Sequence, residues 1–224
     1  PKRKPAPRPP VPLASAPTPV RAWTARILYP VRGRRGPTAR SRVLARIPVE
    51  APYDHGPQVL LVLAARSTVA DGVWYRLLLP DRPNGAAAWV PARAVSVTPT
   101  PYRVKVRLGA RRAELLRSGR VVLRWTVAVG TAANPTPTGR FAVSEVVSQA
   151  DPRGFYGPAI LPLTAHSTRL SDFDGGDGRV ALHGTSRPDL LGTAASHGCV
   201  RMPNAVTRRL ARTLRPGVPV EITP

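Results

Sequence analysis

Short β-type runs separated by turn residues are the feature that most restricts the fold of this chain. Residues 102–108 alternate apolar and polar side chains with a period of two, as a half-buried strand does. Residues 113–117 and 121–129 lie on either side of a Ser-Gly turn and predict a hairpin. Residues 140–147 predict a further strand. No helical periodicity interrupts this half of the chain before residue 147, so we predict a mainly β fold.

One helix is predicted near the C-terminus. Val206, Leu210 and Leu214 recur every four residues with arginines between them, which is the spacing of an amphipathic helix. A Pro-Gly pair at 216–217 ends the helix, and residues 218–222 return as a final strand.

Composition shifts divide the chain into three parts. Residues 1–22 are rich in proline and arginine and predict a disordered linker. Residues 23–98 contain the β-type runs 58–63, 73–79 and 88–91, separated by turn residues, and predict a small β domain. Prolines at 99 and 101 predict a stiff linker over residues 97–101, so that a second domain spans 99–224.

Three aromatic residues of the first domain have two interpretations. Trp74, Tyr75 and Trp89 either line a groove for a wall peptide or glycan, or fill a small β core.

Charge limits the classes of partner. The 224 residues carry 34 Lys and Arg against 12 Asp and Glu, a formal net charge of +22. No helix-turn-helix, zinc-finger or RNP-like pattern accompanies this charge, so we expect no nucleic-acid partner. Anionic polymers of a bacterial envelope are the expected polyanions. No run of 18 apolar residues is present, which predicts no transmembrane segment. The chain begins with Pro rather than Met, and we expect its targeting segment to be absent.

The only cysteine lies in the sequence Ser196-His197-Gly198-Cys199, and His183 precedes it by 16 positions. A single cysteine excludes an intrachain disulfide, and exported proteins seldom retain a free thiol without a use for it. Cys199 is the predicted nucleophile and His183 the predicted base, which either removes the thiol proton or holds the thiolate as an ion pair. Reactivity well below the free-thiol pKa is expected. His197 shares a face with Cys199 if the segment is extended, and lines the site.

These two motifs resemble the signature of the L,D-transpeptidase catalytic domain, the YkuD family: a His-Gly-Thr turn, a spacer, then Ser/Thr-His-Gly-Cys. The resemblance extends from about Pro101 to the C-terminus. Residues 74–92 are similar to the later strands of bacterial SH3-like barrels. Together these resemblances imply a YkuD-type β-sandwich with one helix behind the cysteine turn, preceded by a small SH3-like β-barrel.

The resemblance implies an extracytoplasmic enzyme of cell wall biogenesis that acts on peptidoglycan stem peptides and is a carbapenem target. Its reaction would form 3→3 cross-links through a cysteine thioester. L,D-carboxypeptidase activity, or attachment of a protein to peptidoglycan by the same chemistry, is the alternative. No cofactor and no metal are implied.

Further residues of the two motifs receive roles in the predicted site. The resemblance implies that the carbonyl of Gly184 orients His183. Ser196 and Gly198 are expected to shape the turn and the oxyanion hole. Arg201 is the expected partner of a substrate carboxylate, since its guanidinium binds such groups through two parallel hydrogen bonds. Thr185, which completes the His-Gly-Thr turn, is the second expected substrate-binding residue.

Residues 148–178 are irregular and predict a long loop. Its Phe155-Tyr156-Gly157 run and the apolar run around residues 160–161 indicate that part of it packs as a lid or strand near the cleft. We expect His166 to be a surface residue. Asp172, Asp174 and Asp177 resemble a calcium loop without its final glutamate, which does not favour a metal site. A zinc hydrolase using both motif histidines and the cysteine lacks any supporting carboxylate motif.

Overall fold

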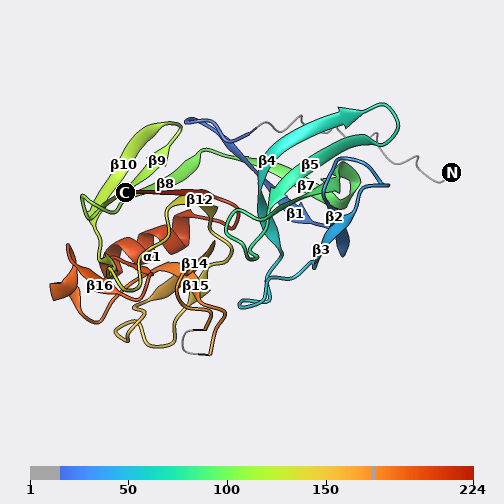
Figure 1. Ribbon diagram of the computed structural model, residues 1–224. Coiled ribbons are helices and arrows are strands. Elements are labelled where there is room, and N and C mark those ends of the chain that lie inside the picture. Colours follow the sequence, from blue (N-terminus) through green and yellow to red (C-terminus); the bar gives the residue numbers. More distant parts are fainter. Residues whose placement is uncertain (1–15, 173–174) are drawn as a thin grey trace.

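The computed structural model describes residues 16–172 and 175–224 (Figure 1). Most of the predicted N-terminal linker, residues 1–15, and Asp174 of the calcium-loop pattern lie outside the described residues. Within them, no helix is both long and apolar enough to cross a membrane.

Residues 22–100 form one antiparallel sheet with its own hydrophobic core, which confirms the predicted strands of this region. In spatial order the strands are β3 (Val43–Ile47), β2 (Val31–Arg34), β6 (Ala87–Pro91), β5 (Gly72–Leu78), β4 (Val59–Thr68), β1 (Ala22–Ile27) and β7 (Val95–Thr100), with the short 3-10 helix η1 (Ala92–Ala94) before β7. Trp74 and Tyr75 are only 3% and 0% exposed, so these two side chains fill the core. Trp89 is half-buried. The SH3-like barrel stays a prediction.

The predicted linker over residues 97–101 was wrong. Strand β7 continues through Thr100 and pairs along its whole length with β1, so that Pro101 alone separates it from the next strand. Pro99 is tolerated because β7 is an edge strand, where a missing N–H removes no inter-strand hydrogen bond. The two domains are therefore joined almost without a spacer.

The second domain is a β-sandwich with one helix. Its larger sheet has the order β10 (Arg120–Thr126), β9 (Arg112–Arg117), β8 (Tyr102–Arg107), β18 (Pro219–Thr223) and β12 (Gly139–Ala142). The second sheet has the order β13 (Val147–Ser148), β14 (Ala159–His166), β15 (Arg179–His183) and β17 (Val200–Arg201). Strands β11 (Val129–Gly130) and β16 (Ala194–Ser196) form a small parallel pair, and η2 (Pro188–Leu190) is a single 3-10 turn.

The predicted helix is confirmed as α1 (Asn204–Thr213). It packs against β14 and β15, and both Leu210 and Leu214 are fully buried in the core that the two sheets share. The predicted hairpin is also present, and its turn places Ser118 and Gly119 at positive φ, 49° and 80°.

Two expectations for the middle of this domain were wrong, and one was right in part. The predicted strand over 140–147 is broken into β12 and β13. Strand β14, eight residues long and almost wholly buried, confirms the strand expected around residues 160–161 but extends through Pro162 to His166, where a loop was expected. His166, expected at the surface, is 2% exposed because it ends β14 against the N-terminal domain.

Polar contacts to backbone groups fasten the two domains together. The guanidinium of Arg82 donates to the carbonyls of Ser167, Leu170 and Asp177 at 2.8–2.9 Å. The amide of Asn84 both donates to the carbonyl and accepts from the N–H of His166, at 2.8 and 2.7 Å. The N-terminal domain thus holds the segment that leads from β14 into β15.

Candidate active site

A tight turn between β16 and β17 presents the cysteine. The hydroxyl of Ser196 donates to the carbonyl of Cys199 at 2.5 Å and accepts from the N–H of Gly198 at 3.1 Å. Gly198 has φ 122°, a conformation that strains any residue with a Cβ. Ser196 and Gly198 therefore fix the shape of the turn. The N–H of Gly198 is already bonded to Ser196 and that of Val200 belongs to a residue paired with Leu182 in the β15–β17 ladder, so the predicted oxyanion hole stays a prediction.

The thiol of Cys199 lies against the start of the next strand. It accepts a hydrogen bond from the N–H of Ala181 at 3.4 Å. Burial raises the pKa of the thiol above its ordinary 9.0, and the N–H of Ala181 and the charge of Arg201 oppose this only in part. Burial disfavours the charged form of the thiol, so the expected reactivity well below the free-thiol pKa stays a prediction that this environment does not favour.

His183 ends β15 and is 1% exposed. Its Nδ1 lies 2.7 Å from the carbonyl oxygen of Gly184, the contact that the family resemblance implied. A carbonyl can only accept, so Nδ1 carries the proton and Nε2 keeps a free lone pair. Burial lowers the pKa of His183 to about 4. The charge of Arg201 adds to this effect, whereas the hydrogen bond to Gly184 opposes it. The imidazole is thus neutral at pH 7 and held in a defined tautomer.

Two aromatic side chains from the β13–β14 connection cover this imidazole. The ring of Tyr156 meets that of His183 edge-on at 5.1 Å, and the ring of Phe155 stacks on it at 6.1 Å. Sequence analysis placed this Phe-Tyr-Gly run near the cleft without assigning it a function. No local pattern indicates its partner, because 27 positions separate Tyr156 from His183.

Asn204, at the start of α1, was missed by sequence analysis. Its Oδ1 accepts from the N–H of Thr185 at 2.8 Å. A Cβ at Gly184 would lie 2.2 Å from that oxygen, and one at Gly157 would lie 2.3 Å from it. The side chain of Asn204 therefore leaves no room for a Cβ at position 157 or 184, so both positions require glycine.

The remaining predicted residues lie around the cysteine in different ways. Arg201 is 7% exposed, and its guanidinium lies 4.9 Å from the centre of the Phe155 ring. Its buried Nε has no hydrogen-bond partner among the described residues. Thr185 is 4% exposed, and its hydroxyl accepts from the N–H of Arg187 at 2.9 Å, so it supports the chain after His183.

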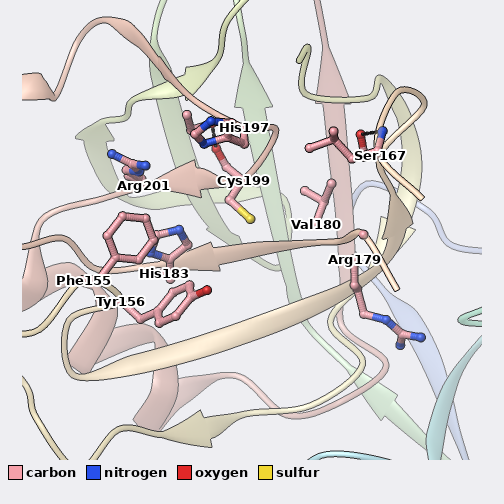
Figure 2. A pocket seen from close by; sticks show the side chains of 12 residues that line it. Phe155, Tyr156, Ser167, Arg179, Val180, His183, His197, Cys199 and Arg201 are labelled. Carbon is pink, nitrogen blue, oxygen red and sulfur yellow. Dashed lines mark hydrogen bonds between the residues drawn. The ribbon is translucent and has the colours of Figure 1, made fainter. Parts of the chain in front are cut away.

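Two cavities meet at Cys199. The smaller, of about 30 Å³, is bordered by His183, His197, Arg201 and the two aromatic residues. Figure 2 shows these side chains grouped around the sulfur of Cys199, whereas the side chain of Arg179 extends away from it. The larger cavity, of about 220 Å³, reaches from Cys199 to Tyr53 in the N-terminal domain. The sulfur is therefore accessible from two sides.

The described residues contain no group of three His, Cys, Asp or Glu side chains arranged to hold a metal ion. The ligand set of the zinc alternative is therefore not assembled there. The carboxylate of Asp177, part of the calcium-loop pattern, instead lies 2.9 Å from Arg179 and 3.1 Å from the Nε2 of His166.

Known proteins resemble the second domain. The YkuD model of the L,D-transpeptidase catalytic domain matches residues 101–222. The provisionally named L,D-transpeptidase YkuD of Bacillus licheniformis is 34% identical over 124 residues, which are 55% of this chain and 67% of that protein. The corresponding protein of Bacillus subtilis strain 168 is 32% identical over 122 residues, 54% of this chain and 66% of that protein. The chain thus spans about two thirds of the length of these relatives.

Solved structures include two L,D-transpeptidases. A cysteine-to-serine mutant of the Enterococcus faecium L,D-transpeptidase is 24% identical to this chain. The match covers 54% of this chain and 49% of that chain, with a TM-score of 0.41. The enzyme from Mycobacterium smegmatis is 17% identical, with 68% and 90% covered and a TM-score of 0.43. Because the family model covers more than half of the 224 residues, this chain belongs to the YkuD family of L,D-transpeptidase catalytic domains.

Proposed function

We propose that this protein is a peptidoglycan L,D-transpeptidase that forms 3→3 cross-links through a thioester on Cys199. The observation that carries the proposal is that this thiol and His183 border one cavity, where the Nδ1 proton of the imidazole is directed at the carbonyl of Gly184 and Nε2 keeps its lone pair. Family membership supports the same chemistry, since the family acts on peptidoglycan.

In the first half-reaction the sulfur attacks the carbonyl carbon of the third residue of a donor stem tetrapeptide. Nε2 of His183 takes the thiol proton as the S–C bond forms. The C–N bond to the terminal D-Ala then breaks, and the same proton passes from Nε2 to the departing amine. Neutral reactants suit this buried site, because charge develops only in the transition state.

Arg201 is the proposed partner of a substrate carboxylate. Its guanidinium borders the smaller cavity and is fixed over the Phe155 ring, with an Nε that lacks a protein acceptor among the described residues. A planar guanidinium held in this way binds a carboxylate with little loss of side-chain freedom.

In the second half-reaction the side-chain amine of another stem's third residue attacks the thioester. Nε2 removes the amine proton, the new amide forms, and the sulfur leaves with that proton. Water in place of the amine would release a tripeptide, and an amine of a protein would attach that protein to the wall. These substrates place the proposed enzyme outside the cytoplasm.

Mass spectrometry of muropeptides after incubation with disaccharide tetrapeptide tests the function. Wild type should release D-Ala and form a 3→3 dimer, whereas Cys199→Ala should leave the substrate intact while keeping its fold. Acylation by a carbapenem should add its mass to wild type and not to Cys199→Ala. Cross-linking by Cys199→Ala, or activity that a chelator abolishes, would contradict the proposal.

A further inference from the structure

The larger cavity at Cys199 is built by both domains. Residues of the catalytic domain form most of its lining, and Tyr53 of the N-terminal domain closes its far side. The backbone N–H groups of Tyr53 and Asp54 donate to Oε2 of Glu145 at 2.7 and 2.8 Å. Glu145 is 0% exposed, so this carboxylate of the catalytic domain holds the 51–55 loop in place. The wall is therefore a constructed part of the site rather than a chance contact between domains.

Arg179 supports the ring of Tyr53. Its guanidinium lies 5.5 Å from the ring centre, within the range of a cation–π contact. The same guanidinium donates to the carbonyl of Pro80 at 3.0 Å and to Asp177 at 2.9 Å. Both bonds come from Nη2, whereas Nε and Nη1 are buried without a hydrogen-bond partner among the described residues.

The cavity is apolar along its length and polar at one end. Its apolar wall consists of Val147, Tyr156, Ile160, Pro162 and Ala181. At the Tyr53 end, Oδ2 of Asp177 contacts His166 and Arg179, whereas its Oδ1 has only the hydroxyl of Tyr53 at 3.5 Å. The side chain of Asp177 is 45% exposed, so Oδ1 has room for another donor.

Asp177 is ionised at neutral pH. Arg179 and His166 hold its pKa at about 2, against the opposing effect of burial. His166 contributes no positive charge at this pH, because burial lowers its pKa below the usual value. The other cation nearby, Arg82, directs its guanidinium at three backbone carbonyls. Oδ1 of Asp177 is accordingly an anionic acceptor at the end of an apolar channel.

We infer that this cavity holds the side chain of the third residue of the donor stem, an aliphatic chain ending in an ammonium group bound by Asp177 Oδ1 and the Tyr53 hydroxyl. This inference rests on the proposed function. The carbonyl of that residue must lie at the sulfur of Cys199, and its own side chain is then the group that enters an adjoining cavity. Apolar walls suit the methylene groups of such a chain, and a carboxylate at the far end suits its ammonium. The N-terminal domain thereby takes part in substrate selection.

Binding of soluble tetrapeptides to Cys199→Ala tests the inference without any turnover. Two peptides differ only in the third residue, which carries lysine in one and norleucine in the other. Calorimetry should show the lysine peptide binding about fivefold more tightly, the scale of one partly exposed ion pair. Adding Asp177→Asn should bring this ratio close to one, and adding Tyr53→Phe should lower it in part. Adding Tyr53→Ala should weaken binding of both peptides, because it removes the wall.

Two control variants match these changes. Tyr29→Ala removes an exposed tyrosine of the N-terminal domain that does not border the cavity, and Asp189→Asn removes an exposed aspartate paired only with Arg187. Neither should change the ratio. Equal affinity for the two peptides in Cys199→Ala, or a ratio that survives both Asp177→Asn and Tyr53→Ala, would overturn the inference. Such a result would leave the proposed function intact, because wild-type cross-linking is measured separately.

Discussion

Titration of the Cys199 thiol tests the neutral thiol–imidazole pair directly. Burial lowers the pKa of His183 to about 4 and raises that of the thiol above 9.0. The two values differ by about 5 units at least, so moving the proton from sulfur to nitrogen costs about 7 kcal/mol before the new charges attract. Even if the two charges approached to about 4 Å, their attraction at an effective dielectric constant of about 20 would recover only about 4 kcal/mol. About 3 kcal/mol then favours the neutral pair, and the ion pair forms less than about 1% of the resting enzyme.

The assay is the ultraviolet absorbance of the thiolate, taken as the difference between wild type and Cys199→Ala. The difference spectrum should show no thiolate band near pH 7, and a band should grow only on the alkaline side of the ordinary thiol pKa of 9.0. His55→Ala, which removes an exposed histidine of the N-terminal domain, should leave the curve unchanged. A strong band near pH 7 that disappears in His183→Ala would refute the reasoning, since it would show a preformed ion pair.

Three further outcomes are expected. His183→Ala should lower the rate of acylation by about 10²–10⁴-fold, nearly as severely as Cys199→Ala, and His197→Ala should have an intermediate effect. Stopped-flow acylation by a carbapenem measures these rates, and a larger loss in His197→Ala than in His183→Ala would reverse the two roles. Glu145→Ala should lower the free energy of unfolding by about 2 kcal/mol, because it removes the buried carboxylate that accepts from the N–H groups of Tyr53 and Asp54, whereas the exposed Glu50→Ala should change it little in the same urea titration. The free energy of unfolding should also fall by about 3 kcal/mol between pH 6.5 and 4, because the unfolded chain protonates His183 over this range and the folded chain does not; a His183→Asn variant without a flatter pH dependence would contradict this.

Patterns within a few residues of one another determined much of the fold in advance. Alternation over residues 102–108 and the Ser-Gly turn that follows indicated β8 and the hairpin, and the four-residue spacing of Val206, Leu210 and Leu214 indicated α1. These signals are reliable because a strand or helix places its apolar residues on one face by its own geometry. The same reliance on local pattern failed at two prolines: Pro99 was assigned to a linker, and the strand through Pro162 was expected to be shorter. Local chemistry disfavours a strand at proline, and only the sheet shows that β7 is an edge and that β14 is buried.

The sequence by itself also predicted Cys199, His183 and the turn that carries the thiol as the site, because the two motifs resemble the family signature. It did not determine the protonation of the pair, which depends on burial by Tyr156 and on the bond to Gly184. Nor did it indicate that Tyr53 lies beside Asp177, 124 positions along the chain. Contacts of this kind have no local pattern, because they exist only after two separately formed sheets dock. The tertiary structure alone decides what surrounds the sulfur.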